Sequence, residues 1–62
     1  MTARVEFIPG RPGDPHRVEL VAADGAREAA WAGPSYLDAM AEARDRAQAL
    51  GVPLVRGKAG AA

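Results

Sequence analysis

The sequence contains no cysteine and only one each of histidine, tryptophan, tyrosine and phenylalanine among its 62 residues. The absence of cysteine excludes a disulfide framework and a thiolate zinc site, and the single histidine excludes a site with several histidine ligands. We therefore expect no metal and no cofactor. Because small folds usually gain stability from such staples, tight packing or self-association has to take their place.

An excess of charge and a long apolar run are also missing. Eight basic and eight acidic residues give a formal net charge of zero, whereas nonspecific nucleic-acid binding normally needs a strongly basic surface. No apolar run approaches the roughly 20 residues of a membrane span, and the N-terminus MTARVEFIPG lacks the apolar core of a signal peptide. We expect a cytoplasmic protein without a membrane partner.

Alternation of polar and apolar residues predicts the first strand. Over residues 4–8, Val5 and Phe7 point to one side, and Ile8 points to the other with two charged residues. The following residues 9–16, PGRPGDPH, hold three prolines and two glycines. Proline cannot donate to a sheet and glycine weakens a strand, so this segment is predicted to be a loop.

A hairpin is predicted over residues 17–32, with strands at 17–23 and 26–32. Asp24-Gly25 is typical of a two-residue type I′ turn. That turn places Leu20 opposite Ala29 and Val18 opposite Trp31. One face then carries Val18, Leu20, Ala22, Ala29 and Trp31, and the other carries Arg17, Glu19, Val21, Glu28 and Ala30.

A helix is predicted over residues 36–50. Ser35 is a suitable N-cap with Asp38 three residues later, and Gly51 followed by Pro53 ends the helix. Its apolar stripe is expected to consist of Tyr36, Met40, Ala43, Ala47 and Leu50, with Leu37 beside it.

A short last strand at 52–56 completes the order β-β-β-α-β. The predicted fold is α+β: a small three- to four-stranded, mainly antiparallel sheet with one helix packed on one face. Residues 1–56 form a single domain in this interpretation, and residues 57–62 form a flexible tail. The sequence leaves open whether the last strand pairs parallel or antiparallel.

Two stretches resemble known small bacterial domains. RVELVAADGAREAAWAGPSYLDAMAEA (residues 17–43) resembles domains of the YegP type, and SYLDAMAEARDRAQALGVPLVRGKAG (residues 35–60) resembles another uncharacterised hairpin-helix-strand family. This chain differs from these families in having the loop of residues 9–16, here called the Pro-Gly loop, and in lacking a lysine-rich helix face. The resemblance implies the fold, and it implies no catalytic motif.

Chemical motifs are few. Asp14, His16 and Ser35 are the residue types of a nucleophile set, but there is no Gly-x-Ser-x-Gly elbow and Ser35 is better explained as a helix cap. The glycine-rich loop precedes a strand rather than a helix, which argues against a phosphate cradle. We therefore predict that the protein is not an enzyme.

The leading hypothesis is a noncatalytic protein-binding module, of adaptor or inhibitor type, which uses a sheet edge, the open sheet face or the Pro-Gly loop. A nucleic-acid-associated protein that uses Arg11, Arg17 and Arg56 is the alternative, and an enzyme with an oligomeric site is a distant third. Ile8 and Val21 on the uncovered face suggest a homodimer. The candidate partner-binding residues are Arg11, His16, Arg17, Val21 and Trp31.

Overall fold

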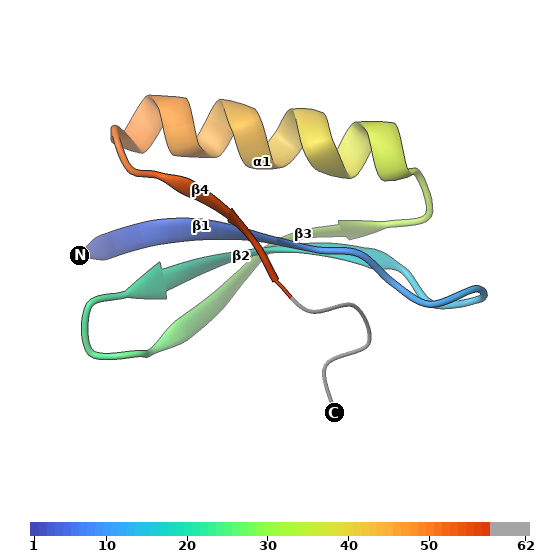
Figure 1. The fold of residues 1–62 in the computed structure, drawn as a ribbon, viewed down its shortest axis with the longest axis horizontal. Coiled ribbons are helices and arrows are strands. Elements are labelled where there is room, and N and C mark those ends of the chain that lie inside the picture. Colours follow the sequence, from blue (N-terminus) through green and yellow to red (C-terminus); the bar gives the residue numbers. More distant parts are fainter. Residues whose placement is uncertain (58–62) are drawn as a thin grey trace.

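In a computed structural model, which describes residues 1–57, one helix lies across one face of a four-stranded sheet (Figure 1). The strand order in the sheet is β3-β2-β1-β4. The predicted α+β class and the order β-β-β-α-β are confirmed. The elements are β1 (Thr2–Ile8), β2 (His16–Ala22), β3 (Arg27–Gly33), α1 (Tyr36–Leu50) and β4 (Leu54–Arg56).

The last strand makes the sheet mixed. β1 pairs antiparallel with β2, and β2 pairs antiparallel with β3, but β4 pairs parallel with β1. The helix carries the chain back over the sheet, so β4 runs in the direction of β3 and therefore also of β1. β4 has three residues and pairs with Val5, Glu6 and Phe7 in the second half of β1.

The core lies between α1 and the strands β1 and β2. Val5, Phe7 and Val18 pack there against three alanines of the helix. The predicted helix stripe is partly wrong, because the buried helix residues are Ala39, Ala43 and Ala47. Small side chains at these positions let the helix approach the sheet closely. Two larger residues of the predicted stripe are displaced to the margins, where Tyr36 is 42% exposed and Leu50 is 49% exposed.

The turn between β2 and β3 differs from the predicted type I′. The Gly25 N–H donates to the Ala22 carbonyl at 2.9 Å, and the Ala22 N–H donates to the Ala26 carbonyl at 2.8 Å. Gly25 has a φ of 92°, whereas no non-glycine residue within 1–57 has a positive φ. The loop is therefore a three-residue connection with a left-handed glycine at its end. Asp24 Oδ1 accepts a hydrogen bond from the Ala26 N–H at 2.9 Å, an Asx turn that stabilises this connection.

A bulge in β3 compensates for this longer turn. Next to the turn, Leu20 lies opposite Glu28 instead of the predicted Ala29, which lies opposite Glu19. The register then shifts, and Val18 lies opposite Trp31 as predicted. Ala30 is the extra residue of β3 at this shift. Because of the bulge, Val18 and Trp31 still lie opposite each other, although the turn is one residue longer than the predicted turn.

Replacing Gly25 by valine is expected to destabilise the protein by about 1–2 kcal/mol, because a β-branched residue is strained at positive φ. No atom lies within 4 Å of a Cβ built at Gly25, so the cost comes from the backbone alone. Urea unfolding measures the change, with Gly25→Asn as the matched control. Asparagine tolerates the left-handed region and should lose less stability. Equal losses in the two variants would contradict this account of the turn.

The helix ends follow the prediction. Ser35 Oγ accepts a hydrogen bond from the Asp38 N–H at 3.1 Å, and Gly51 is left-handed with a φ of 68°. After β4, the Gly57 N–H donates to the Phe7 carbonyl at 2.8 Å. The rest of the predicted tail, residues 58–62, lies outside the described part of the chain. Within residues 1–57, α1 is too short and too polar to cross a membrane.

Candidate functional site

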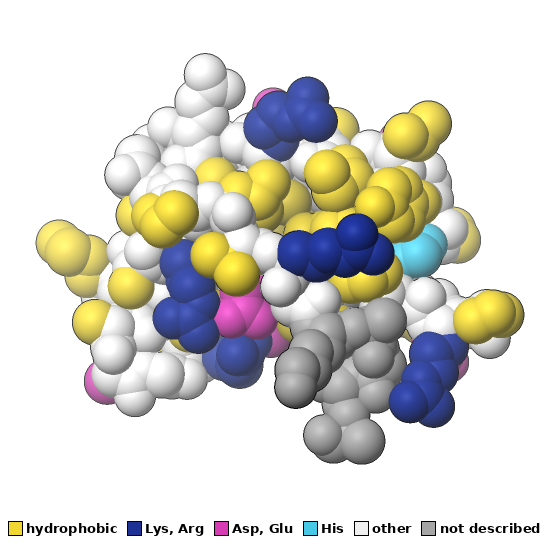
Figure 2. Space-filling view, in the orientation of Figure 1, with side chains coloured by type: hydrophobic (Ala, Val, Ile, Leu, Met, Phe, Trp, Pro, Cys, Tyr) yellow, Lys and Arg dark blue, Asp and Glu magenta, His cyan; other side chains and the backbone are white. Residues whose placement is uncertain are grey.

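A groove lies between the first half of α1 and β4. Apolar side chains gather on this side of the molecule, with basic side chains among them (Figure 2). Tyr36 is 42% exposed and Leu54 is 36% exposed, so both offer apolar surface to a partner. The groove is open because the alanine line of the helix covers the middle of the sheet and leaves β4 at its side. Its lining residues are Phe7, Tyr36, Met40, Leu54 and Arg56.

Two exposed side chains lie next to Met40 on α1, outside the lining of the groove. Leu37, Met40 and Arg44 follow one another at spacings of three and four residues, so they share one side of the helix. Leu37 is 77% exposed. The opposite side of the helix carries Arg46, whose Nη2 donates to the Ala30 carbonyl of β3 at 3.2 Å. The β4 side of the helix therefore presents apolar and basic side chains together.

Three rings fix one end of the groove. Tyr36 packs edge-to-face on Phe7 and on His16, with ring centroids 5.1 and 5.5 Å apart. The centroids of Phe7 and His16 are 6.4 Å apart. The two Tyr36 separations fall in the range in which edge-to-face contacts are favourable. Tyr36 is therefore held in place by packing while its outer side remains accessible.

His16 connects this aromatic cluster to the Pro-Gly loop. The sequence placed His16 in the loop, but it is the half-buried first residue of β2, opposite Gly33. Its Nδ1 accepts a hydrogen bond from the Gly10 N–H at 2.9 Å. The proton of the neutral ring is then on Nε2. His16 therefore links the aromatic cluster to the loop through its two sides.

The outer edge of β4 carries unpaired backbone groups. The Val5 N–H donates to the Pro53 carbonyl at 3.0 Å, and the Gly57 N–H donates to the Phe7 carbonyl at 2.8 Å. Alternation along a parallel ladder then turns the N–H and carbonyl groups of Leu54 and Arg56 away from β1. An extended chain could pair with these groups while its side chains reach the groove.

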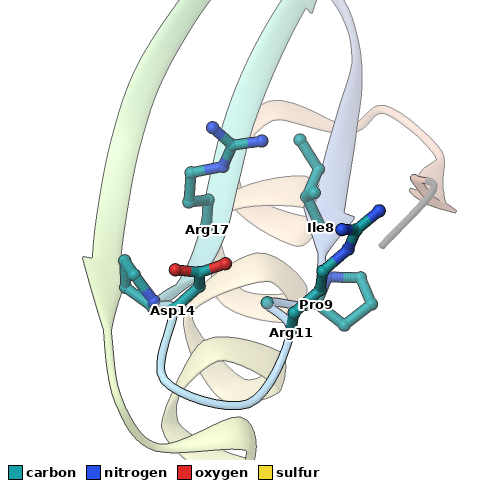
Figure 3. A pocket seen from close by; sticks show the side chains of 7 residues that line it. Ile8, Pro9, Arg11, Asp14 and Arg17 are labelled. Atoms are coloured by element: carbon teal, nitrogen blue, oxygen red, sulfur yellow. The ribbon is translucent and has the colours of Figure 1, made fainter. Parts of the chain in front are cut away.

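The Pro-Gly loop forms a separate hollow at the end of β1 and β2. The side chains of Arg11, Asp14 and Arg17 surround this hollow together with Ile8 and Pro9 (Figure 3). The Asp14 N–H donates to the Arg11 carbonyl at 2.8 Å, which makes a turn at the loop tip. An acidic side chain thus lies between the two arginines that the sequence suggested as a basic cluster.

Charged residues cover the sheet face opposite the helix. Glu6 and Glu19 lie directly opposite each other, and Arg27 Nη1 contacts a carboxylate oxygen of each, at 2.9 and 3.0 Å. Arg4 Nε adds a contact to Glu6 at 2.9 Å. The hydrogen bonds from Arg27, followed by those from Arg4, lower the pKa of Glu6 although burial opposes the shift. The two arginines relieve the repulsion between the carboxylates.

The structure separates the predicted partner-binding residues. Val21 lies on the open face between Arg4 and Arg27, but it is 0% exposed. Trp31 is partly buried and packs against the core beneath α1. Arg17 lines a hollow on the open face with Glu6, Glu19 and Arg27, and Arg56 at the sheet edge borders both this hollow and the groove. His16 packs on Tyr36 and Phe7, which line the groove. Arg56, which the sequence suggested for nucleic-acid binding, lines the groove itself.

Sequence reasoning missed most residues of the groove. Tyr36 and Met40 were assigned to the apolar stripe of the helix, and Leu54 to the last strand. The signal that could have found them is the alanine content of α1. Three alanines at a spacing of four residues form one line along the helix, and the helix packs on the sheet through this line. The large apolar residues beside the line are then available for contact with another molecule.

Within residues 1–57, no three His, Asp or Glu side chains lie together in a way that could hold a metal ion. His16 Nδ1 and Ser35 Oγ both accept backbone hydrogen bonds, so each has a structural role. No protein-family model, curated protein or solved structure matches the chain. The resemblance to YegP-type domains therefore stays a prediction.

Proposed function

We propose that the protein is a noncatalytic binding module that takes an extended segment of another protein at the free edge of β4. The observation that carries this proposal is the coincidence of unpaired backbone groups at Leu54 and Arg56 with the exposed apolar side chains of Tyr36 and Leu54 in the groove. In strand addition, backbone hydrogen bonds supply affinity and side-chain pockets supply specificity. The β4 edge offers both on one side of the molecule.

The other sheet edge is less suitable for pairing. β3 carries the bulge at Ala30, and the carbonyl of that residue already accepts a hydrogen bond from Arg46 of the helix. A bulge interrupts the regular row of backbone groups that a partner strand needs, and it commonly protects an edge from pairing. These features favour β4 as the binding edge, although β4 is shorter.

The structure gives less support to the two alternatives, which are binding through the open sheet face and binding of nucleic acid through the basic residues. Ile8 is 5% exposed and Val21 is 0% exposed, so the two apolar residues expected on the open face contribute little surface. Arg4 and Arg27 pair with carboxylates there. Acidic residues also line the hollows around Arg17. Among residues 1–57, this arrangement offers no continuous basic surface for a phosphate backbone.

Two substitutions of Arg56 test the proposed strand addition. Both Arg56→Ala and Arg56→Pro remove the guanidinium, but only proline also removes the outward N–H. The unlabelled chain is used to select binders from a random nonapeptide library, and affinities are measured by fluorescence anisotropy. We expect Arg56→Pro to bind at least about fivefold more weakly than Arg56→Ala, the equivalent of about one hydrogen bond. Backbone NMR shifts should change at residues 54–56 and at the first turns of α1.

Several outcomes would contradict the proposal. Equal affinities of the two variants, or peptide-induced shifts confined to the Pro-Gly loop, would place binding elsewhere. Binding of mixed-sequence nucleic acid with a steep salt dependence that Arg11→Ala and Arg17→Ala weaken would support the alternative. The predicted homodimer makes a second copy the competing occupant of the edge. A dimer in sedimentation equilibrium that Arg56→Pro dissociates would identify that copy as the partner.

A further inference from the structure

We infer that the segment bound along β4 is an extended acidic-apolar peptide, in which a carboxylate stands two residues from an apolar anchor. This inference rests on the proposed strand addition at β4. It follows from the charges around the groove and from the spacing of side chains in an added strand.

The groove is apolar with a positive rim. Arg56 lines it together with Phe7, Tyr36, Met40 and Leu54, and none of these lining residues is acidic. Arg44 follows Met40 by one helical turn on the same side of α1. Arg56 and Arg44 are both exposed, in contrast to the half-buried Arg46, which contacts Glu42 on the other side of the helix. A partner with carboxylates complements the β4 side, and a basic partner is repelled by it.

The geometry of a strand sets the spacing of the two partner groups. Alternate side chains of an added strand point to the same face, and residues i and i+2 are about 7 Å apart. Leu54 and Arg56 differ by two positions in β4 and, by their pairing with Val5 and Phe7, both face the helix side. When an apolar side chain of the peptide lies beside Leu54, the peptide residue two positions further along lies beside Arg56. A carboxylate at that neighbouring position meets a guanidinium.

Three fluorescein-labelled nonapeptides test this inference. Each has a threonine-rich extended sequence with a central leucine, and the residues two positions before and after the leucine are both aspartate, both serine or both lysine. We expect the aspartate peptide to bind about tenfold more tightly than the lysine peptide at low salt, and the difference to shrink with added salt. Arg56→Glu should reverse the order of the two charged peptides. The control Ala23→Glu adds an acidic side chain at the exposed turn after β2, which β1 separates from β4 in the sheet, and should leave the order unchanged.

Each outcome decides between the two proposals. Equal binding of the three peptides, or tightest binding of the lysine peptide, would overturn the acidic specificity and leave strand addition standing. If neither the natural chain nor a variant binds any of the three peptides at millimolar concentration, both the acidic specificity and strand addition are overturned. A far-ultraviolet circular dichroism spectrum of Arg56→Glu identical to that of the natural chain shows that a reversed order reports on charge.

Discussion

Replacing Gly10 by alanine is expected to reduce the free energy of unfolding by about 3 kcal/mol. A Cβ on Gly10 would lie 2.4 Å from the Pro15 carbonyl oxygen and 2.5 Å from that of Asp14. Both are backbone atoms, so the loop itself has to move, and overpacking of this kind costs about 1–3 kcal/mol. The movement also breaks the hydrogen bond from the Gly10 N–H to His16 Nδ1, which is worth about 1 kcal/mol.

Urea unfolding of Gly10→Ala is compared with that of Gly13→Ala in the same loop. Gly13 has a φ of 91° and open space around a built Cβ, so its substitution costs backbone strain without a clash. That strain is worth about 1 kcal/mol. A loss at Gly10 no greater than the loss at Gly13 would show that the close approach of the two ends of the loop does not contribute to stability. His16→Phe, which keeps the ring but removes the acceptor, isolates the hydrogen bond.

Replacing Glu6 by glutamine is expected to cost about 2 kcal/mol at pH 7. Glu6 is 7% exposed, and its two carboxylate oxygens accept hydrogen bonds from Arg4 and Arg27. Hydrogen bonds to charged groups are worth about 1.5–3 kcal/mol. We take the lower part of this range because the Arg27 side chain is 46% exposed and can regain water when its partner is lost. Glu19, opposite Glu6, keeps one contact with Arg27.

The same carboxylate makes stability depend on pH. The pKa of Glu6 is lowered in the folded state, so the unfolded chain binds the proton more readily. The contribution of Glu6 to stability is therefore complete above the ordinary pKa of glutamate, and it is lost as the pH falls through the lowered pKa of the folded state. Between pH 7 and pH 3, the natural chain should lose more stability than Glu6→Gln.

The control for Glu6 is Glu42→Gln, in the half-buried pair with Arg46 on the helix. A helical pair at this spacing contributes about 0.2–0.5 kcal/mol, so this variant should keep the pH dependence of the natural chain. Parallel acid dependence in the natural chain and in Glu6→Gln would show that the network on the open face does not set the acid sensitivity of the fold.

Local chemistry carried much of the fold prediction. Ser35 and Gly51 bracket the helix because a side-chain acceptor and a left-handed residue satisfy its free backbone groups. Alternation of Val5 and Phe7 predicted the buried face of β1, and the prolines of residues 9–15 predicted the loop. The candidate site was much less predictable. Of the residues singled out for partner binding, His16 packs on residues that line the groove, whereas Val21 is buried on the opposite face.

The sequence by itself determined the elements and their order, since capping, turn residues and periodicity act within a few residues of one another. Only the tertiary structure decided the parallel pairing of β4, the bulge at Ala30 and the line Ala39–Ala43–Ala47 on which the helix rests. These features depend on contacts between residues far apart in the chain, where packing selects among arrangements that local preferences leave equal. The groove beside β4 results from that selection, because close packing of the alanines leaves Tyr36 and Leu54 exposed at its border.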